Sequence, residues 1–248
     1  MTSERFSHKR GALVAFAVST DFVWVAVHVQ ALAALGLVEG DPRFYLAYQI
    51  GRCTVAATAI AVALRSGLFG RRELGLVGAR HGAALCKVAR IVGVVALIAA
   101  VFVSGVYLIA PGTAYEVARR SLVVPVIYSS EAFVRDLLCM VVVAPVYEEL
   151  VYRALLLSAL RDRLGEQAAL LAGGAVFVGL HYAYGYGWHA GYMGVALVLG
   201  LIFLRTRSIV PALVLHTLNN LWVVLNWRAR DVLGDAAILG WLCSPGPP

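Results

Sequence analysis

Charged residues are scarce in this sequence. Only 14% of its 248 residues are Asp, Glu, Lys or Arg, whereas a soluble globular domain contains about 25%. Hydrophobic residues make up 61% of the chain, and the mean hydropathy is +0.81. Because the deficit of charge extends along the whole length, we expect an all-α, polytopic helical membrane protein with about seven to eight transmembrane helices in one bundle.

Other features are absent as well, and each absence excludes a class of function. No basic run is interleaved with aromatic residues, so the net charge of +7 does not indicate a nucleic-acid partner. The four cysteines show no CxxC spacing, which favours buried thiols over a redox or metal motif. Internal repeats, which many transporters contain, are also missing.

Long apolar stretches follow one another through the chain. A helix needs about 20 apolar residues to cross the hydrocarbon core of a bilayer. We therefore expect the whole chain, 1–248, to form a single integral membrane domain. Its spans are predicted at residues 11–37, 46–68, 88–110, 132–160, 167–184, 187–204 and 209–227, with a shorter stretch at 236–243 that is a partial eighth span or a surface helix.

Basic residues predict the orientation of these spans. With a cytoplasmic amino terminus, the inner loops contain more arginine and lysine than the outer loops, as the positive-inside rule requires. The inner loops then hold Arg65, Arg71, Arg72, Arg80, Lys87, Arg90, Arg161, Arg163, Arg205 and Arg207. The outer loops hold Arg43, Arg119, Arg120, Arg228 and Arg230. The short loops and the composition favour a bacterial inner (cytoplasmic) membrane.

The fourth stretch carries two adjacent carboxylates, Glu148 and Glu149, inside an apolar segment. Ionisable residues at membrane depth are costly and usually mark a function. Glu149 and Arg153 are four residues apart, so we expect them to pair along one face of the helix. Glu148 points about 100° away, lacks that partner, and is expected to stay free for chemistry. Pro145 removes a backbone hydrogen bond just before the glutamates and is expected to kink the helix.

Two later spans place polar side chains at a similar depth. His181 lies in the fifth span, with Phe177 one turn before it on the same face. His216 and Asn220 lie four residues apart in the seventh span. At about 1.5 Å per residue, all of them and Glu148 fall near the middle of the membrane, so they are able to converge. Hydrogen bonds between membrane helices average only about 0.6 kcal/mol, which favours a functional site over a purely structural cluster.

The first span also carries polar residues, Asp21 and His28. For these we favour structural hydrogen bonds to neighbouring helices over a role in catalysis.

Short motifs occur in a fixed order along these spans. EELVYR at 148–153 fits EExxxR, FVGLH at 177–181 fits FxxxH, and HTLNN at 216–220 contains HxxxN. In this order and spacing the chain resembles the CPBP family of intramembrane proteases, which includes CAAX prenyl endopeptidases and bacteriocin-processing and self-immunity proteins. The sequence departs from the usual pattern at Tyr152, where Phe is common, and at Ala154, where Gly is common.

The resemblance implies that the catalytic helices lie within residues 132–227. Glu148 and His181 would position and activate a water molecule, and His216 and Asn220 would form the oxyanion site. The geometry of the site would be supported by Glu149, Arg153 and Phe177. The implied reaction is hydrolysis of a peptide bond near a membrane-embedded or lipid-modified terminus, in a protein or peptide substrate bound to the lipid bilayer, without a metal or other cofactor.

Other functions stay open at this point. A zinc-dependent intramembrane metalloprotease would use the glutamates and histidines as ligands, although no HExxH pair lies on one helix. A transporter or channel would use buried Glu and His residues to relay protons. An immunity protein would bind a partner without catalysis. No recognisable pattern identifies the substrate, its prenylation or the oligomeric state.

Overall fold

The computed structural model describes residues 3–37, 42–77, 86, 90, 130–183 and 189–233. Within these ranges the chain is all-helical, as predicted, and contains no β-strand. The helices are α1 Ser3–Ala33, α2 Pro42–Arg65, α5 Ser130–Asp136, η1 Leu137–Val143, α6 Ala144–Glu148, η2 Glu149–Leu157, α7 Ser158–Leu164, α8 Glu166–Ala183, α9 His189–Thr206 and α10 Ile209–Leu233. Apart from residue 90, the expected spans 88–110 and 236–243 lie outside the described residues, so the number of spans stays a prediction.

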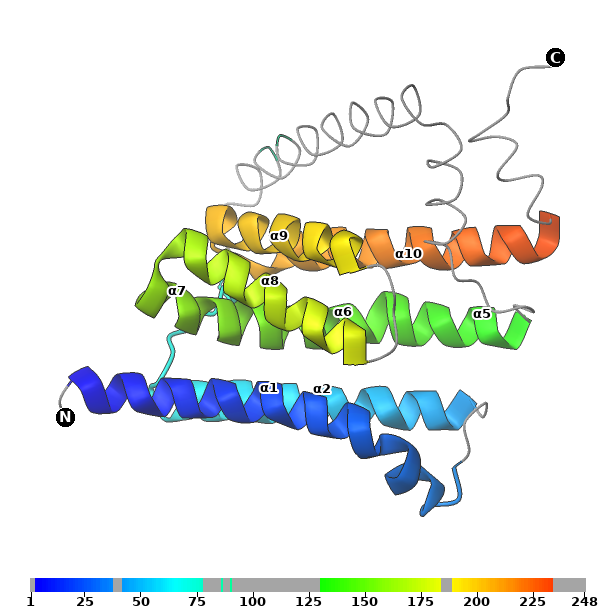
Figure 1. The fold of residues 1–248 in the computed structure, drawn as a ribbon, viewed down its shortest axis with the longest axis horizontal. Coiled ribbons are helices and arrows are strands. Elements are labelled where there is room, and N and C mark those ends of the chain that lie inside the picture. Colours follow the sequence, from blue (N-terminus) through cyan, green and yellow to red (C-terminus); the bar gives the residue numbers. More distant parts are fainter. Residues whose placement is uncertain are drawn as a thin grey trace.

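The segments α5, η1, α6, η2 and α7 follow one another without a break from residue 130 to residue 164, and we call them the central helix. Figure 1 shows α1 and α2 side by side in one layer, the central helix and α8 in the middle, and α9 and α10 on the opposite side. Both outer layers contact the central helix, α1 and α2 from one side and α10 from the other. Polar side chains on these helices can therefore meet in the middle layer.

The first helix begins earlier than hydropathy predicts. α1 begins at Ser3 and so includes polar residues that precede the expected span at 11–37. A hydropathy pattern locates only the apolar part of a helix, and a helix continues into polar sequence where its charged side chains find partners. Arg10 is an example, because its Nη1 donates to Glu73 at 2.6 Å and to Asp162 at 2.7 Å.

These contacts gather several loops at one end of the bundle. Arg10 joins the start of α1 to the turn after α2 and to the end of α7. At the same end, Arg207 pairs with Glu166 at 2.8 Å and so joins the α9–α10 turn to the start of α8. Figure 1 shows this end at the left, beside the amino terminus. The predicted orientation requires the inner basic loops to lie at one end of the bundle. The parts of these loops that belong to the described residues do lie there.

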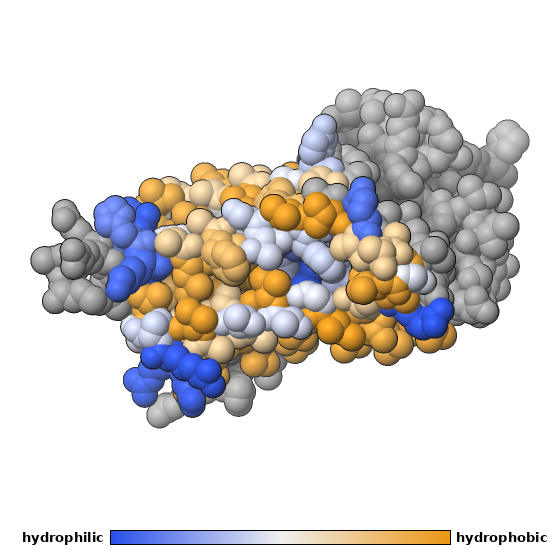
Figure 2. Space-filling view, turned by 90° about the horizontal axis from the view of Figure 1, so that it is seen from below, coloured by the Kyte–Doolittle hydropathy of each residue, from blue (hydrophilic) through white to orange (hydrophobic). Residues whose placement is uncertain are grey.

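Large apolar side chains are exposed along the outer faces of the bundle, while charged side chains are buried inside it. On the central helix and on α10 a set of exposed residues recurs every four positions, which is one helical face. They are Val134, Leu138, Val142, Val146, Val210, Val214, Leu218 and Trp222. Figure 2 shows apolar residues over the middle of the α1–α2 face and hydrophilic residues mainly toward its ends.

Among the described helices, 43–65 is the one long and apolar enough to cross a membrane by length and composition. The segments 191–206 and 209–225 are shorter apolar helices.

The turn after α2 packs tightly against the start of α10. Gly75 has a φ of +66°, and its carbonyl accepts a hydrogen bond of 3.1 Å from the N–H of Ile209. A Cβ atom at this position would lie only 2.7 Å from the Phe203 ring. Glycine is therefore required here both for its backbone conformation and for the close approach of the two segments.

We expect Gly75→Ala to destabilise the protein more than Gly67→Ala. Both glycines have a φ of +66°, so both substitutions incur backbone strain of about 1–2 kcal/mol. A Cβ at Gly67 meets nothing within 4 Å, whereas the one at Gly75 collides with Phe203. Thermal unfolding of the purified proteins measures the difference, and equal unfolding temperatures would contradict the packing of this turn.

Candidate active site

The central helix is not a regular α-helix. π-Helical turns occupy η1 and η2 on either side of the short α6. Such turns are rare and are frequently found at functional sites. Glu148 is the last residue of α6 and Glu149 the first of η2, so the two carboxylates lie where the helical geometry changes.

Pro145 explains one contact between the central helix and α10. In η1 the N–H of Ala144 donates to the carbonyl of Cys139. In an α-helix the same N–H would donate to the Met140 carbonyl, which therefore lacks this donor. The π-helical donor to Met140 would be residue 145, but proline has no N–H. The side-chain amide of Asn220 donates to this carbonyl instead, at 2.8 Å. The backbone hydrogen bond that Pro145 removes is thus replaced by a bond from α10.

Glu149 is fully buried and has partners on two helices. Its Oε1 lies 3.0 Å from Nη1 of Arg153, which is the pair predicted from the spacing. The same oxygen accepts a hydrogen bond of 2.8 Å from Nδ1 of His216 on α10. Because a carboxylate only accepts hydrogen bonds, this contact holds the His216 proton on Nδ1 and fixes the orientation of the ring.

Glu148 has charged partners as well. Its Oε2 lies 3.6 Å from Nε2 of His216, and its Oε1 lies 3.6 Å from Nη2 of Arg52 on α2. Helical spacing shows only the partners along the same helix, so it did not predict these two contacts with α10 and α2. A separation of 3.6 Å is an ion-pair distance and too long for a hydrogen bond, so the lone pairs of this carboxylate can still accept hydrogen bonds from a water molecule.

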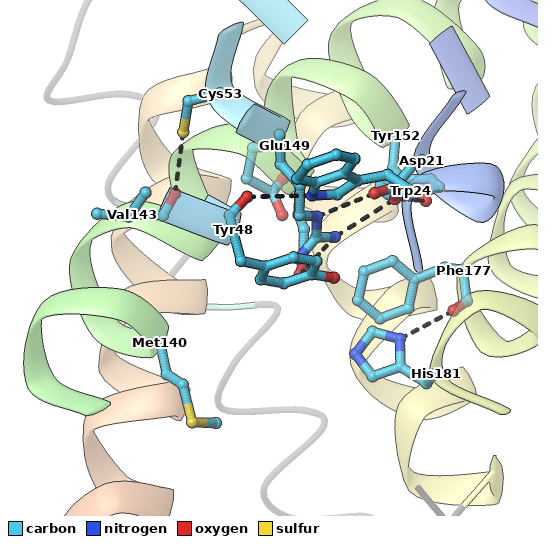
Figure 3. Close-up of polar contacts among 12 residues, drawn as sticks. Asp21, Trp24, Tyr48, Cys53, Met140, Val143, Glu149, Tyr152, Phe177 and His181 are labelled. Carbon is cyan, nitrogen blue, oxygen red and sulfur yellow. Dashed lines mark hydrogen bonds and ion pairs between the residues drawn. The ribbon is translucent and has the colours of Figure 1, made fainter. Parts of the chain in front are cut away.

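Arg52 is held by α1 and by the central helix. Its Nε and Nη2 donate to the two carboxylate oxygens of Asp21 at 2.9 and 3.3 Å. The Tyr152 hydroxyl donates to the same carboxylate at 2.7 Å, and Figure 3 shows the two residues together at one side of the cluster. The guanidinium carbon of Arg52 lies 4.0 Å from the centre of the Tyr147 ring. Asp21 thus makes the hydrogen bonds to neighbouring helices that its position predicts.

His28 makes one hydrogen bond within α1 and aromatic contacts with α2. Its Nδ1 lies 3.1 Å from the carbonyl oxygen of Trp24, so this hydrogen bond stays within α1 and does not reach a neighbouring helix. The ring packs 4.5 Å from that of Tyr48 on α2, which makes the contact between the two helices aromatic.

His181 lies in a stack of aromatic rings. Its Nδ1 donates to the carbonyl oxygen of Phe177 at 2.9 Å, so in the neutral ring Nε2 is the acceptor. The ring centre is 4.3 Å from that of Phe177 and 4.2 Å from that of Tyr192 on α9. Phe177 also lies 6.3 Å from the His216 ring and 4.7 Å below the Arg153 guanidinium. Phe177 therefore joins His181 to the glutamate cluster, and Figure 3 shows it beside His181.

The buried charges of this cluster balance only when one proton is added. The cluster contains two arginines and three carboxylates, namely Arg52, Arg153, Asp21, Glu148 and Glu149. With every carboxylate ionised, the sum is one negative charge too many for an apolar interior. A proton on Nε2 of His216 or on Glu148 restores neutrality, and these two groups face each other. The geometry therefore suits the transfer of a proton.

A small cavity of about 10 Å³ lies beside Arg153, with room for roughly one water molecule. Apart from the ion pair with Glu149, the Nη1 and Nη2 atoms of Arg153 have no hydrogen-bond partner among the described residues. The cavity is otherwise lined by Tyr152, Leu157, Leu170, Gly173, Gly174, Ala196 and Gly200.

A metal site was the alternative explanation for the glutamates and histidines. The described part of the chain contains no group of three or more His, Cys, Asp or Glu side chains that could hold a metal ion. The Oε1 atom of Glu149 is shared by Arg153 and His216, which makes this oxygen less suited to bind a cation, whereas the hydrogen bonds at Nδ1 of His181 and His216 leave Nε2 of both rings unaffected.

The sequence interpretation leaves out one charged residue of the cluster, Arg52. It lies in the middle of the apolar helix 43–65, so the rule that singles out Glu148 and Glu149, a charge inside an apolar span, applies equally to it. The predicted residues that the structure brings into one buried contact network are Glu148, Glu149, Arg153, Phe177, His181 and His216. Asn220 lies one turn beyond His216 on α10 and is bonded to the backbone of η1.

Comparison with protein-family models gives a match to the type II CAAX prenyl endopeptidase Rce1-like model over residues 130–222. This agrees with the family resemblance of the motifs. No curated protein and no solved structure matches the chain. The matched residues include the central helix, α8, α9 and most of α10, whereas α1 and α2, which carry Asp21 and Arg52, precede them.

Asn220→Ala is expected to lower the free energy of unfolding by about 1 kcal/mol or more, because the partly buried Met140 carbonyl would lose its donor. Asn219→Ala is the matched control, since Asn219 makes only a 3.3 Å contact with Asn220. Chemical unfolding of both purified variants measures the effect. Equal stability of the two would show that the bond to Met140 does not support the packing of α10.

Proposed function

We propose that this chain, whose residues 130–222 carry a domain of the type II CAAX prenyl endopeptidase Rce1-like family, is an intramembrane endopeptidase of the glutamate type. It hydrolyses a peptide bond near a membrane-embedded or lipid-modified terminus of its substrate. The observation that carries this proposal is the buried chain of contacts from Glu149 through His216 to Glu148.

The lipid bilayer is the proposed surroundings of the bundle. Apolar side chains recur along the exposed faces of the central helix and α10, and exposed apolar surface of this extent is typical of contact with lipid. We place the basic end of the bundle, with the amino terminus, on the cytoplasmic side of a bacterial inner membrane. The chain would then form a single integral membrane domain with its catalytic helices within residues 132–227.

Water activation is assigned to Glu148 and His181. The Glu148 carboxylate accepts a proton from water, assisted by the Nε2 lone pair of His181, and the hydroxide oxygen bonds to the carbonyl carbon of the scissile peptide. The tetrahedral intermediate then collapses as the C–N bond breaks. The proton held by Glu148 passes to the leaving nitrogen, so the products are a carboxylic acid and an amine, and Glu148 returns to its starting state.

Stabilisation of the oxyanion is assigned to His216 and Asn220. Glu149 orients His216 in the way a buried carboxylate orients the imidazole of a serine-protease triad, so that a proton on Nε2 can be donated. Asn220 uses one N–H for Met140, and its second N–H is the donor assigned to the oxyanion. In hydrolases, the loss of one such donor lowers kcat by about 10²–10³-fold. Arg153 and Phe177 support the arrangement.

Glu148→Gln is expected to abolish cleavage and to leave the protein folded in the membrane. Glutamine keeps the shape of the side chain and replaces only contacts at ion-pair distance, but it cannot accept the proton of water. The measurement is a proteomic comparison of membrane-protein termini in cells that make the wild type, Glu148→Gln or Glu166→Gln. Glu166 is the matched control, because it is exposed and paired with Arg207.

Termini formed by the wild type and by Glu166→Gln, and missing with Glu148→Gln, would identify the substrate. The same termini in all samples, with Glu148→Gln folded and inserted, would contradict the glutamate mechanism. That result would favour a non-enzymatic membrane protein, an immunity or transport protein with a buried Glu/His cluster.

Metal dependence is tested separately on the purified protein. We expect full cleavage of a synthetic peptide spanning the identified site after exhaustive chelation, with the metal content determined on the same sample. The physical reason is that Arg153 lies 3.0 Å from Glu149 and Arg52 lies 3.6 Å from Glu148, so positive charge already occupies positions beside both carboxylates. Activity lost with the metal and restored by stoichiometric zinc would establish the metalloprotease alternative.

A further inference from the structure

Arg52 is a buried cation on a helix that the family match does not include. It lies within the apolar helix 43–65, and its side chain is only 3% exposed. An arginine at such a position is expensive unless it has a specific partner, and it usually marks a functional site. Its nitrogens contact two carboxylates, Asp21 on α1 and Glu148 on the central helix.

We propose that Arg52 is a positioning residue for the cleavage reaction: clamped by Asp21, it orients the Glu148 carboxylate toward the water molecule from which Glu148 accepts a proton. This inference rests on the proposed function of Glu148. It assigns to α1 and α2 a part in the chemistry of a site whose motifs all lie on later helices.

The geometry of the clamp supports orientation as well as charge. Nε and Nη2 of Arg52 both bond to Asp21, at 2.9 and 3.3 Å, and two contacts fix the plane of a guanidinium group. The Tyr147 ring lies 4.0 Å from the guanidinium carbon, and such a contact favours a planar cation. Nη2 is thereby held 3.6 Å from Oε1 of Glu148. A lysine would carry the charge but could not form this two-point contact.

Tyr152 extends the clamp to the sequence motif itself. Its hydroxyl donates to Asp21 at 2.7 Å. Tyr152 is also one of the two residues at which this chain departs from the usual family pattern, because Phe is common at that position. The hydroxyl therefore provides a bond between the motif helix and α1 that phenylalanine cannot make.

Several charged or titratable groups face Glu148, and the effect of Arg52 must be separated from theirs. His216 faces it from α10 at 3.6 Å, and His181 of α8 interacts with it electrostatically. Its own helix contributes Glu149 and Arg153, which are paired with each other. On the α1–α2 side, Arg52 lies within 4 Å of Glu148 and is itself paired with Asp21. Unlike the histidines, Arg52 carries a permanent charge.

The test observes Glu148 itself and needs no substrate. Polarised infrared spectroscopy of the protein in oriented membranes measures the direction of carboxyl stretching bands, and the band lost in Glu148→Gln identifies Glu148. In Arg52→Gln we expect this band to lose its dichroism, because the group that holds the carboxylate in one direction is removed. In Arg52→Lys we expect the same loss, because lysine cannot form the two-point contact with Asp21.

Arg65→Gln is the matched control, because it removes an arginine from the same helix about 20 Å away along the axis; it should leave the dichroism of the Glu148 band unchanged. Arg52→Gln strands the buried Asp21 carboxylate and so endangers folding. The double variant Asp21→Asn with Arg52→Gln removes both charges together and is expected to fold and to show the same loss of dichroism. Formation of the product termini in cells should fall at least tenfold in both, and also in Arg52→Lys, where orientation is lost.

The outcomes separate this inference from the proposed function. Wild-type dichroism of the Glu148 band in folded Arg52→Gln or in the double variant would overturn it and show that Arg52 only joins α1 to α2. Wild-type product formation in Arg52→Lys would also overturn it. If Glu148→Gln still forms the product termini, the proposed function fails, and the infrared measurement still decides whether Arg52 orients Glu148.

Discussion

Two adjacent carboxylates in an apolar interior are the constraint on which the rest of this structure depends. A buried charge without compensation costs several kcal/mol, so Glu148 and Glu149 require partners, and adjacent residues on a helix cannot share one face. Glu149 finds Arg153 on its own helix and His216 on α10. Glu148, turned away from Arg153, takes Arg52 from α2 and the other nitrogen of His216. The packing of both outer layers against the central helix provides these partners.

The irregular backbone of the central helix serves the same arrangement. A π-helical turn and Pro145 leave the Met140 carbonyl without a backbone donor, and Asn220 supplies one. Asn220 thus links the backbone of the central helix to α10, at a position one turn from His216. The cluster is held by hydrogen bonds to backbone groups as well as by ion pairs, which limits the freedom of the side chains that carry charge.

The distribution of polarity over the molecule differs from that in a soluble bundle. Charged side chains are buried among the apolar residues of the core, and apolar stripes lie on the outer faces. In the lipid surroundings that we propose, the hydrophobic effect alone would not drive the helices together. Specific polar contacts between helices then become important for holding the layers together. The Asp21–Arg52 pair and the Tyr152 hydroxyl make such contacts between α1, α2 and the central helix. They join the two amino-terminal helices to the segment that matches the endopeptidase family.

The sequence by itself determined the features that depend on local spacing. Periodicity and apolar length predict the helices, four-residue spacing predicts the Glu149–Arg153 pair, and the order of the motifs indicates the family. Helix ends were less predictable, because the start of α1 depends on partners of Arg10 that are distant in sequence. Only the tertiary structure decided which side chains meet across helices: Arg52 with Glu148, His216 with both glutamates, and Asn220 with Met140. The physical reason is that helical spacing fixes directions around one axis, whereas the charge that each carboxylate meets depends on how neighbouring axes are placed and rotated.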